Sequence, residues 1–348
     1  MKLAIVIGTR AEALKMKSII HHLKHFSHLD FITIYTGQHP HLLPHKSQCQ
    51  TPVRKGLCPL RDREHQIEYY KMVIIDQLKP YKEMLVLVQG DTYSAIAGAR
   101  AGKALGFTIG HIEAGLRTFD HSNPYPEEMN RTEITQLATW HYAPTARSVS
   151  HLVNEGISQD KIFLTGNTII DLFSKATQKW KPYPKIRKVK VLVLLHRQEN
   201  RAFRIQRWYK WIQNLSLEAK YQVDWVLHPN PATYPTSMPF HGRIKFHLPL
   251  PYASFQRLLN NCNLLITDSG GVTEEAAFMG KPILIARIRT ERPEVIEVGL
   301  GELISSTESN FKKQIKRLEA SVIAGKSQSI FGDGHAAKRI VNHLETII

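Results

Sequence analysis

Cysteine is scarce in this sequence, which has three in 348 residues: Cys49, Cys58 and Cys262. Three thiols cannot form a disulfide framework, so we expect a protein of the reducing cytoplasm rather than a disulfide-stabilised secreted domain. Long apolar runs are also missing, since no stretch approaches the roughly 18 residues that suggest a membrane span. The apolar segment Lys2–Ile7 runs into a glycine turn, which indicates a first β-strand and not a targeting peptide. We therefore expect no membrane partner.

Acidic residues are outnumbered, because 46 Lys and Arg stand against 30 Asp and Glu and the formal net charge is +16. Such an excess suits either nucleic-acid binding or the attraction of anionic metabolites. The basic residues are scattered, with clusters as far apart as residues 185–188 and 312–317, and they form no arginine-rich arm or nucleic-acid motif. We interpret the charge mostly as solvated surface and expect no nucleic-acid partner.

A complete dinucleotide-binding pattern, G-x-G-x-x-G after the first strand, is absent, so we expect no nicotinamide and no other cofactor. Strand and helix patterns alternate in both halves of the chain, which predicts an α/β fold. The length suits two domains, and the Lys- and Pro-rich residues 175–190 are typical of a linker. We place the domains at residues 1–174 and 186–334 and expect each to be Rossmann-like.

Residues 264–285 contain a buried strand, a Ser-Gly-Gly turn, a helix and a second buried strand. Glycines before a helix leave backbone N–H groups at the positive end of the helix dipole, an arrangement that binds phosphate. Ser269, Gly270 and Gly271 are therefore candidates to cradle a phosphate group. Glu275, about one turn into the helix, can accept the hydroxyls of a ribose. The alternative interpretation is an ordinary strand–helix turn with glycine for packing.

A charged turn, residues 287–294, follows the second of these strands. Ligands of open α/β sheets bind outside the carboxyl ends of the strands. A guanidinium fixed there, such as that of Arg292, can meet a diphosphate through two hydrogen bonds. This turn favours the phosphate-binding interpretation.

Three carboxylates of the first domain, Asp91, Glu113 and Glu127, come after or near successive strand ends. We expect them to converge on one rim of the sheet, where crowded carboxylates shift one another's protonation and suit acid/base catalysis. A single carboxylate at such a place means little, and Asp91 could be only the neighbour of a helix cap at Thr92.

Short motifs spread over nearly the whole chain resemble those of the non-hydrolysing UDP-N-acetylglucosamine 2-epimerases. They are residues 8–15 (GTRAEALK), 36–39 (TGQH), 89–92 (QGDT), 111–118 (HIEAGLRT), 124–131 (PYPEEMNR), 196–200 (HRQEN), 228–231 (HPNP), 268–275 (DSGGVTEE) and 291–294 (ERPE). The sequence departs from family usage at Ala11, where proline is usual, and most strongly in residues 40–75 and 197–222.

The resemblance implies the GT-B architecture, with two Rossmann-type domains facing each other across a cleft and residues 335–348 packing back on the first. It implies an isomerase that interconverts UDP-N-acetylglucosamine (UDP-GlcNAc) and UDP-N-acetylmannosamine (UDP-ManNAc). In this family UDP is eliminated to give 2-acetamidoglucal and is then added back, and the product supplies precursors for surface polysaccharide. We expect a homodimer with a UDP-sugar as its substrate.

The resemblance also implies roles for individual residues. Asp91, Glu113 and Glu127 would transfer protons at C2 of the sugar. The groups that would stabilise charge on the diphosphate are His196, Arg10, Lys15 and Arg292. Arg131 would contact the substrate, and the ring of Phe255 would lie against the uracil or, alternatively, pack in the core.

Other interpretations stay open. An epimerase of a UDP-diacetamido-uronic acid sugar shares these motifs, a hydrolysing 2-epimerase would release free N-acetylmannosamine, and a non-catalytic nucleotide- or nucleic-acid-binding protein would fit the charge. The residues His39, His41, His45, Cys49 and Cys58 suggest zinc, but their spacing matches no familiar four-ligand pattern. We favour a basic loop there and expect no metal.

Overall fold

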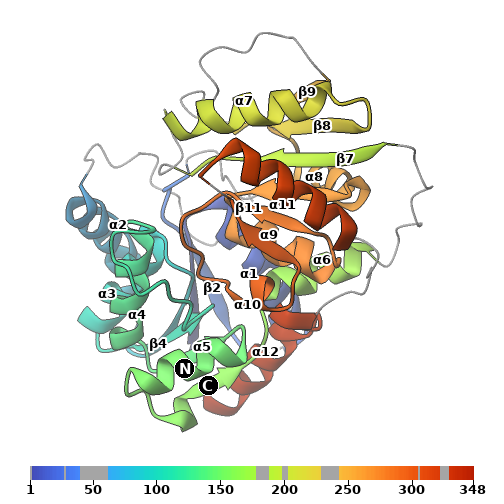
Figure 1. Cartoon of the computed structure of the whole chain (residues 1–348). Helices are drawn as coiled ribbons and strands as arrows, with labels where there is room; N and C mark the ends of the chain where they lie inside the picture. Colours follow the sequence, from blue (N-terminus) through green and yellow to red (C-terminus); the bar gives the residue numbers. More distant parts are fainter. Residues whose placement is uncertain are drawn as a thin grey trace. The chain divides into compact units, whose positions relative to one another are not determined.

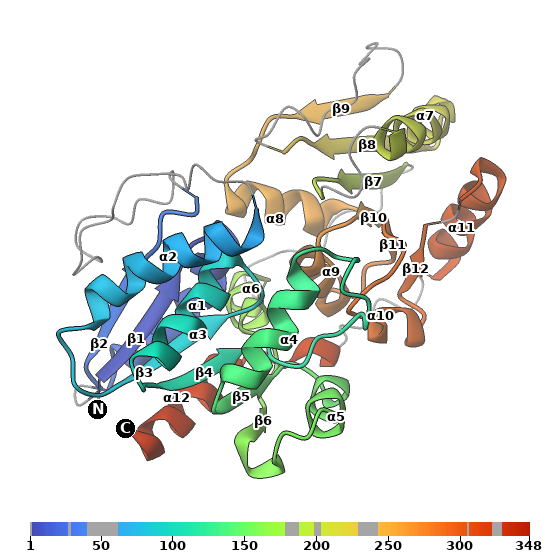
Figure 2. The same cartoon turned by 90° about the vertical axis from the view of Figure 1, so that its left-hand side faces the viewer.

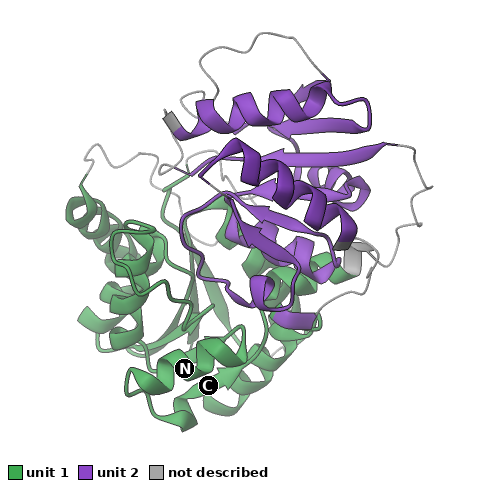
Figure 3. Ribbon diagram, in the orientation of Figure 1, with its two compact units in different colours: residues 1–178, 331–348 green, residues 179–330 purple. Residues whose placement is uncertain are grey.

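A computed structural model describes residues 2–26, 29–39, 62–177, 188–197, 203–228, 243–304, 306–321 and 329–348. The chain divides into two compact units (Figure 3). Unit 1 consists of Met1–Gln178 and Phe331–Ile348, and unit 2 of Lys179–Ile330. None of the described helices is long and apolar enough to cross a membrane.

Unit 1 contains a six-stranded parallel sheet (Figure 1), whose strands, labelled in Figure 2, have the order β2-β1-β3-β4-β5-β6. Its strands are β1 (Lys2–Ile7), β2 (Phe31–Tyr35), β3 (Met84–Gln89), β4 (Thr108–Ile112), β5 (Trp140–Ala143) and β6 (Ile162–Leu164). The chain adds β2 on one side of β1 and then β3 on the other, so the order reverses between β1 and β3. Ligands of doubly wound sheets bind at the carboxyl ends of the strands beside such a reversal.

Helices cover both faces of this sheet, because both faces of its strands are apolar. Leu3, Ile5 and Ile7 of β1 belong to a buried cluster with α1 (Arg10–Leu23) and α12 (Ala336–Ile347). The alternate residues of β1 belong to a second cluster with α2 (Arg63–Leu78), α3 (Tyr93–Ala104) and α4 (Glu127–Leu137), which Figure 2 shows along one face of the sheet. The other helices of the unit are α5 (Ala146–Asn154), the 3-10 helix η1 (Gln159–Lys161) and α6 (Thr168–Thr177), and the 3-10 helix η5 (Ser329–Phe331) lies at the point where the chain returns from unit 2.

The last helix, α12, packs on α1 and α6. Asp171 of α6 accepts hydrogen bonds from the backbone N–H groups of Ala336 (3.0 Å) and Ala337 (2.6 Å). A carboxylate at a helix N-terminus satisfies donors that the helix itself leaves unpaired. Asp171 thus fixes the end of the chain to unit 1.

Unit 2 has the same design, with strand order β12-β11-β10-β7-β8-β9 and parallel pairing throughout. Its strands are β7 (Val189–Leu194), β8 (Tyr221–Val226), β9 (Ile244–His247), β10 (Leu264–Thr267), β11 (Ile283–Ile285) and β12 (Gly301–Leu303). Its helices are α7 (Phe203–Leu217), α8 (Tyr252–Asn261), α9 (Gly270–Phe278), α10 (Glu294–Glu297) and α11 (Glu308–Ser321). The strand order reverses between β7 and β10, where sequence analysis places His196 and the Ser-Gly-Gly turn.

Candidate active site

The loops after β1 and β3 lie at the reversal point of unit 1 and are joined by Glu12. Thr9 caps α1, and the Glu12 carboxylate accepts hydrogen bonds from the backbone N–H groups of Gly8 (2.9 Å) and Thr9 (2.6 Å). Thr92, which caps α3, donates its hydroxyl to the same carboxylate at 2.5 Å. Burial raises the pKa of Glu12, and these hydrogen bonds oppose that rise. Glu12 therefore fastens the loop that carries Asp91 to the start of α1.

Glu113 follows β4, is 6% exposed, and has a backbone φ of +67°, which is uncommon for a residue other than glycine. The Nζ atom of Lys15 lies 2.5 Å from Glu113 Oε2, and the amide of Gln89 donates to the same oxygen. Both contacts hold this oxygen in place. Lys15 therefore meets an expected proton-transfer group, whereas Arg10, at the start of α1, is exposed.

Asp91 follows β3 and pairs with the guanidinium of Arg131. Arg131 is 3% exposed, and its Nη1 also donates to Glu128 Oε2 at 2.9 Å. The other oxygen of Glu128 accepts hydrogen bonds from the backbone N–H groups of Thr118 (2.9 Å) and Phe119 (3.0 Å). Arg131 thus links Asp91 to a buried carboxylate that holds the loop after β4.

The expected carboxylates share one rim of unit 1. Asp91 and Glu113 follow neighbouring strands, and the N–H of Gly90 donates to the carbonyl of Ile112 at 3.0 Å. Glu127 is the first residue of α4 and is partly exposed. The next turn of α4 meets Asp91 through Arg131 and through a hydrogen bond from Asn130.

In unit 2, Asp268 joins the loops after β7 and β10. It is 1% exposed, and its carboxylate accepts hydrogen bonds from the backbone N–H groups of His196 (3.0 and 3.1 Å) and Arg197 (2.9 Å). The Nδ1 atom of His196 lies 3.3 Å from the same carboxylate, and its ring stacks on that of His228 with centroids 5.4 Å apart. Asp268 thus orients the imidazole that sequence analysis assigns to the diphosphate.

The two glycines of the turn before α9 differ in their surroundings. A Cβ atom on Gly270 would overlap the guanidinium of Arg292, so packing alone requires glycine there. A Cβ atom on Gly271 would meet no atom within 4 Å. Glycine inside a helix is less favourable than alanine by roughly 0.5–1 kcal/mol. Packing of the described residues does not account for Gly271, which leaves open space beside the first turn of α9.

Arg292 lies behind this turn and is 4% exposed. Its Nε is 2.6 Å from Glu274 Oε1, and its Nη1 is 2.5 Å from Glu291 Oε1. Glu291 also pairs with Arg287. The guanidinium expected at a diphosphate is therefore held by two buried carboxylates, which fix its position.

Glu275, the expected ribose ligand, is 3% exposed and accepts a hydrogen bond from the hydroxyl of Tyr252 at 3.0 Å. Burial and the neighbouring carboxylate raise the pKa of Tyr252, so the hydroxyl remains a donor. Phe255 lies on α8, one turn after Tyr252, and is 7% exposed.

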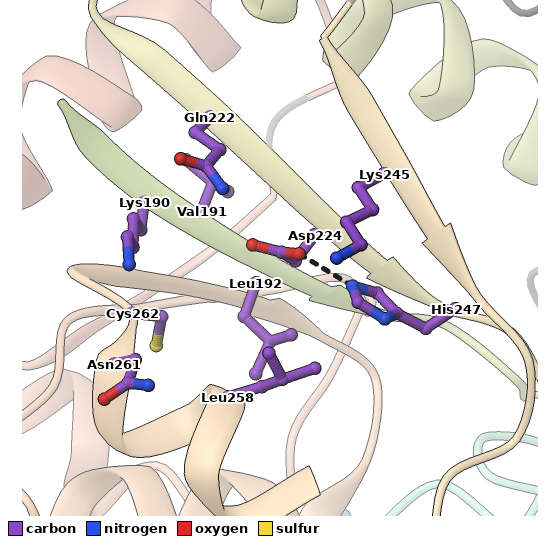
Figure 4. A pocket seen from close by; sticks show the side chains of 10 residues that line it. All are labelled: Lys190, Val191, Leu192, Gln222, Asp224, Lys245, His247, Leu258, Asn261 and Cys262. Carbon is purple, nitrogen blue, oxygen red and sulfur yellow. Dashed lines mark hydrogen bonds and ion pairs between the residues drawn. The ribbon is translucent and has the colours of Figure 1, made fainter. Parts of the chain in front are cut away.

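A cavity of about 200 Å³ lies elsewhere in unit 2, on the face of the sheet formed by β7, β8 and β9 (Figure 4). Lys190, Asp224, Lys245 and His247 contribute to its lining, and His247 Nε2 lies 2.7 Å from Asp224 Oδ1. None of the residues that sequence analysis assigned to the site lines this cavity.

In the part of the chain that the structure describes, no group of three or more His, Cys, Asp or Glu side chains is arranged to hold a metal ion. Of the residues that suggested zinc, His41, His45, Cys49 and Cys58 lie outside the described residues. The ring of His39 accepts a hydrogen bond from the backbone N–H of Arg10 at 3.3 Å.

Sequence reasoning did not single out the buried carboxylates that hold these groups. Glu12 had a visible signal, the capping-box pattern Thr-x-x-Glu at the start of a helix. Asp268 directly precedes the Ser-Gly-Gly turn, which is the kind of place where a carboxylate can bridge two strand ends. Glu128 gave no signal apart from its spacing of three residues from Arg131, because its other partners, the N–H groups of Thr118 and Phe119, come from a different loop.

Two doubly wound α/β units, one with a carboxylate rim and one with a glycine turn before a helix, define the class of α/β proteins whose ligand sites lie at the carboxyl ends of parallel strands. The sequence model of the family described as UDP-N-acetylglucosamine 2-epimerase matches residues 21–345. The chain therefore belongs to the UDP-N-acetylglucosamine 2-epimerase family and is an enzyme of the isomerase class.

Individual relatives agree over the full length. The UDP-N-acetylglucosamine 2-epimerase of Bacillus subtilis is 33% identical over an alignment of 360 positions, which covers 99% of this chain and 95% of that protein. The crystal structure of the Neisseria meningitidis enzyme bound to UDP-GlcNAc has a TM-score of 0.89 and 28% identity, and covers 99% of this chain and 100% of that one. The Methanocaldococcus jannaschii enzyme in complex with UDP-GlcNAc and UDP has a TM-score of 0.84 and 28% identity, with 99% and 100% covered.

Proposed function

We propose that this enzyme interconverts UDP-GlcNAc and UDP-ManNAc. The observation that carries the proposal is the carboxylate rim of unit 1, where Asp91 and Glu113 follow neighbouring strands and each meets a cation from a helix. Relatives that match the whole chain carry this activity in their names, and two of the solved ones hold UDP-GlcNAc.

The reaction we propose begins with elimination. The C2 proton of the sugar is not adjacent to a carbonyl carbon, so direct removal would leave an unstabilised carbanion. If a base takes this proton while the bond from C1 to the phosphate oxygen breaks, the electron pair forms the C1–C2 double bond of 2-acetamidoglucal and UDP leaves. An acid then returns a proton to the other face of C2, and the UDP oxygen attacks C1. Asp91, Glu113 and Glu127 are the groups we assign to these proton transfers.

The groups of unit 2 hold UDP in this proposal. Ser269, Gly270 and Gly271 cradle phosphate at the helix N-terminus, and the open space beside Gly271 supports a close approach there. His196 and Arg292 stabilise the charge of the diphosphate, and Glu275 holds the ribose hydroxyls. Arg10 and Arg131 complete the substrate contacts.

We further propose that the enzyme acts in the cytoplasm as a homodimer, without a nucleic-acid partner, and that its product supplies ManNAc-type precursors for surface polysaccharide. The three cysteines support the reducing compartment. The scattered distribution of the basic residues argues against a nucleic-acid site.

One assay separates this reaction from its alternatives: incubation with UDP-GlcNAc in deuterated water, followed by NMR. We expect both UDP-sugars at equilibrium, deuterium at C2, and little free UDP. Stoichiometric free N-acetylmannosamine would show a hydrolysing enzyme. Turnover of a UDP-diacetamido-uronic acid sugar without turnover of UDP-GlcNAc would show the related epimerase.

A further inference from the structure

Two buried side chains hold the peptide groups that precede and follow the Cα atom of Asp91. The carbonyl of Gly90 lies 2.8 Å from His111 Nε2, and the carbonyl of Asp91 accepts a hydrogen bond from Asn130 Nδ2, also at 2.8 Å. His111 comes from β4 and is 0% exposed, and Asn130 comes from α4 and is 1% exposed. Gly90 itself has a φ of +69°, so the turn adopts a conformation that favours glycine.

We propose that His111 and Asn130 are positioning residues, which clamp the backbone of Asp91 so that its carboxylate is aimed for proton transfer at C2. The proposal rests on the proposed function, because it requires Asp91 to act on the sugar. The carboxylate has its own contact with Arg131, so the backbone clamp adds the anchoring that this ion pair alone does not give.

The tautomer of His111 follows from its partner. A carbonyl oxygen only accepts hydrogen bonds, so Nε2 must carry the proton. Burial lowers the pKa of His111 to about 3, with Arg117 and His141 acting in the same direction and the Gly90 carbonyl and Asp91 opposing. The ring is therefore neutral at physiological pH and has a single N–H, which it gives to Gly90. Its Nδ1 is buried and has no hydrogen-bond partner among the described residues.

That unpartnered nitrogen has a cost. A buried polar atom without a hydrogen bond destabilises a fold by roughly 1–3 kcal/mol. An apolar residue at this position of the parallel strand would avoid the cost, since Val88 beside it on β3 and Ile112 after it on β4 are buried and apolar. Histidine differs from such a residue because its Nε2 donates a hydrogen bond to the carbonyl of Gly90.

The orientation of the Asn130 amide is also fixed. Its Oδ1 accepts a hydrogen bond from Nε of Arg63 at 2.9 Å, so the amide nitrogen must face Asp91. Arg63 is 8% exposed, and its Nη2 donates to Glu133 at 2.8 Å. A continuous chain of hydrogen bonds therefore runs from Glu133 through Arg63 and Asn130 to the carbonyl of Asp91. The two bonds that Arg63 forms are charge-assisted.

The test uses His111→Leu, which removes the donor, and His111→Gln, whose amide nitrogen reaches about as far as Nε2. The matched control is His141→Leu, because His141 pairs with His111 in the strand register, is 1% exposed, and forms no hydrogen bond to Gly90 or Asp91 in the described structure. Asn130→Asp tests the second arm, since it keeps the acceptor for Arg63 and loses the donor to Asp91.

Displacement of a catalytic group by about 1 Å commonly costs about 100-fold in rate. We expect kcat to fall about 10- to 100-fold in His111→Leu and in Asn130→Asp, with KM within about threefold of the wild type. His111→Gln should recover most of kcat, and His141→Leu should resemble the wild type. Imidazole 15N NMR at pH 5 should show His111 neutral and protonated at Nε2.

Two results would overturn the clamp. One is equal loss of kcat in His141→Leu and His111→Leu with no recovery by glutamine, and the other is a His111 ring whose Nε2 carries no proton, since it could not then donate to Gly90. Asp91→Asn is measured in parallel to separate the two proposals. If it retains normal turnover, the role of Asp91 fails; if it is inactive while His111→Leu and Asn130→Asp match the control, only the clamp fails.

Discussion

Lys15 and Glu113 form an ion pair with 2.5 Å between Nζ and Oε2, and their side chains are 10% and 5% exposed. The sequence suggested separate tasks for them, charge on the diphosphate for Lys15 and proton transfer for Glu113. The contact joins these two tasks, because the Lys15 ammonium fixes the position of the carboxylate that would exchange a proton at C2.

Replacing Lys15 should therefore lower the rate of the chemical step as well as substrate affinity. In Lys15→Met the carboxylate of Glu113 loses the ammonium that holds it in place, so kcat should fall about 10- to 100-fold because the proton-transfer group is displaced. The measurement is kcat and KM of epimerisation beside those of Lys17→Met, an exposed lysine of the same helix. An unchanged kcat with a raised KM would instead place Lys15 at the diphosphate alone.

The expected proton-transfer groups can be tested one at a time. Asp91→Asn, Glu113→Gln and Glu127→Gln should each abolish epimerisation and leave the protein folded, because each keeps the side-chain shape and removes the titratable oxygen. Turnover is followed by NMR and folding by circular dichroism. Near-normal turnover in two of the three variants would contradict the assignment.

The carboxylate rim was predictable because it follows from one rule, that parallel strands end on the same edge. The partners of these carboxylates were not. Lys15 is 98 residues from Glu113, and Arg131 reaches Asp91 from a helix that begins after one further helix and one further strand. Such pairs depend on how helices pack on the sheet, which the spacing of apolar residues does not determine. The role of Asp268, by contrast, could have been suspected from its place between a buried strand and the Ser-Gly-Gly turn.

The two glycines of the turn before α9 should respond differently to alanine. Gly271→Ala places its Cβ in open space, so the free energy of unfolding should stay the same or rise by about 0.5–1 kcal/mol. UDP affinity should fall, because the added methyl group takes space beside the diphosphate. Gly270→Ala should lower stability, because its Cβ overlaps the guanidinium of Arg292. Thermal unfolding without ligand and calorimetric titration with UDP measure the two effects. Unchanged UDP affinity in Gly271→Ala would leave the phosphate-binding interpretation of this turn unsupported.

Arg292→Ala should affect both binding and folding. It leaves the buried Glu274 and Glu291 without this partner, and removing one member of a buried pair commonly costs about 3–5 kcal/mol. The loss of a charged contact to the diphosphate should weaken UDP binding about ten- to a hundredfold and release more 2-acetamidoglucal per turnover. Arg289→Ala, on the exposed part of the same turn, is the control. A fall in stability with unchanged UDP affinity would show that Arg292 stabilises the fold and does not bind UDP.

Acid stability should depend on the two histidines that β4 and β5 place side by side. Burial lowers the pKa of His111 to about 3 and that of His141 to about 4, from an ordinary value of 6.5. Because the unfolded chain binds protons near pH 6.5 and the folded chain does not, the stabilisation is complete above that pH and is lost as the pH falls toward 4 and 3.

Each such histidine adds a slope of about 1.4 kcal/mol per pH unit between pH 6.5 and its folded pKa. In His141→Leu the free energy of unfolding should therefore depend less steeply on pH, by about 1.4 kcal/mol per pH unit. Urea unfolding at pH 7, 6 and 5 measures this slope. The stability of the variant relative to the wild type should improve as the pH falls. His25→Leu, at an exposed position, should leave the slope unchanged. If His141→Leu and the wild type lose stability equally between pH 6 and 5, His141 takes up its proton in the folded protein, and burial does not keep it neutral.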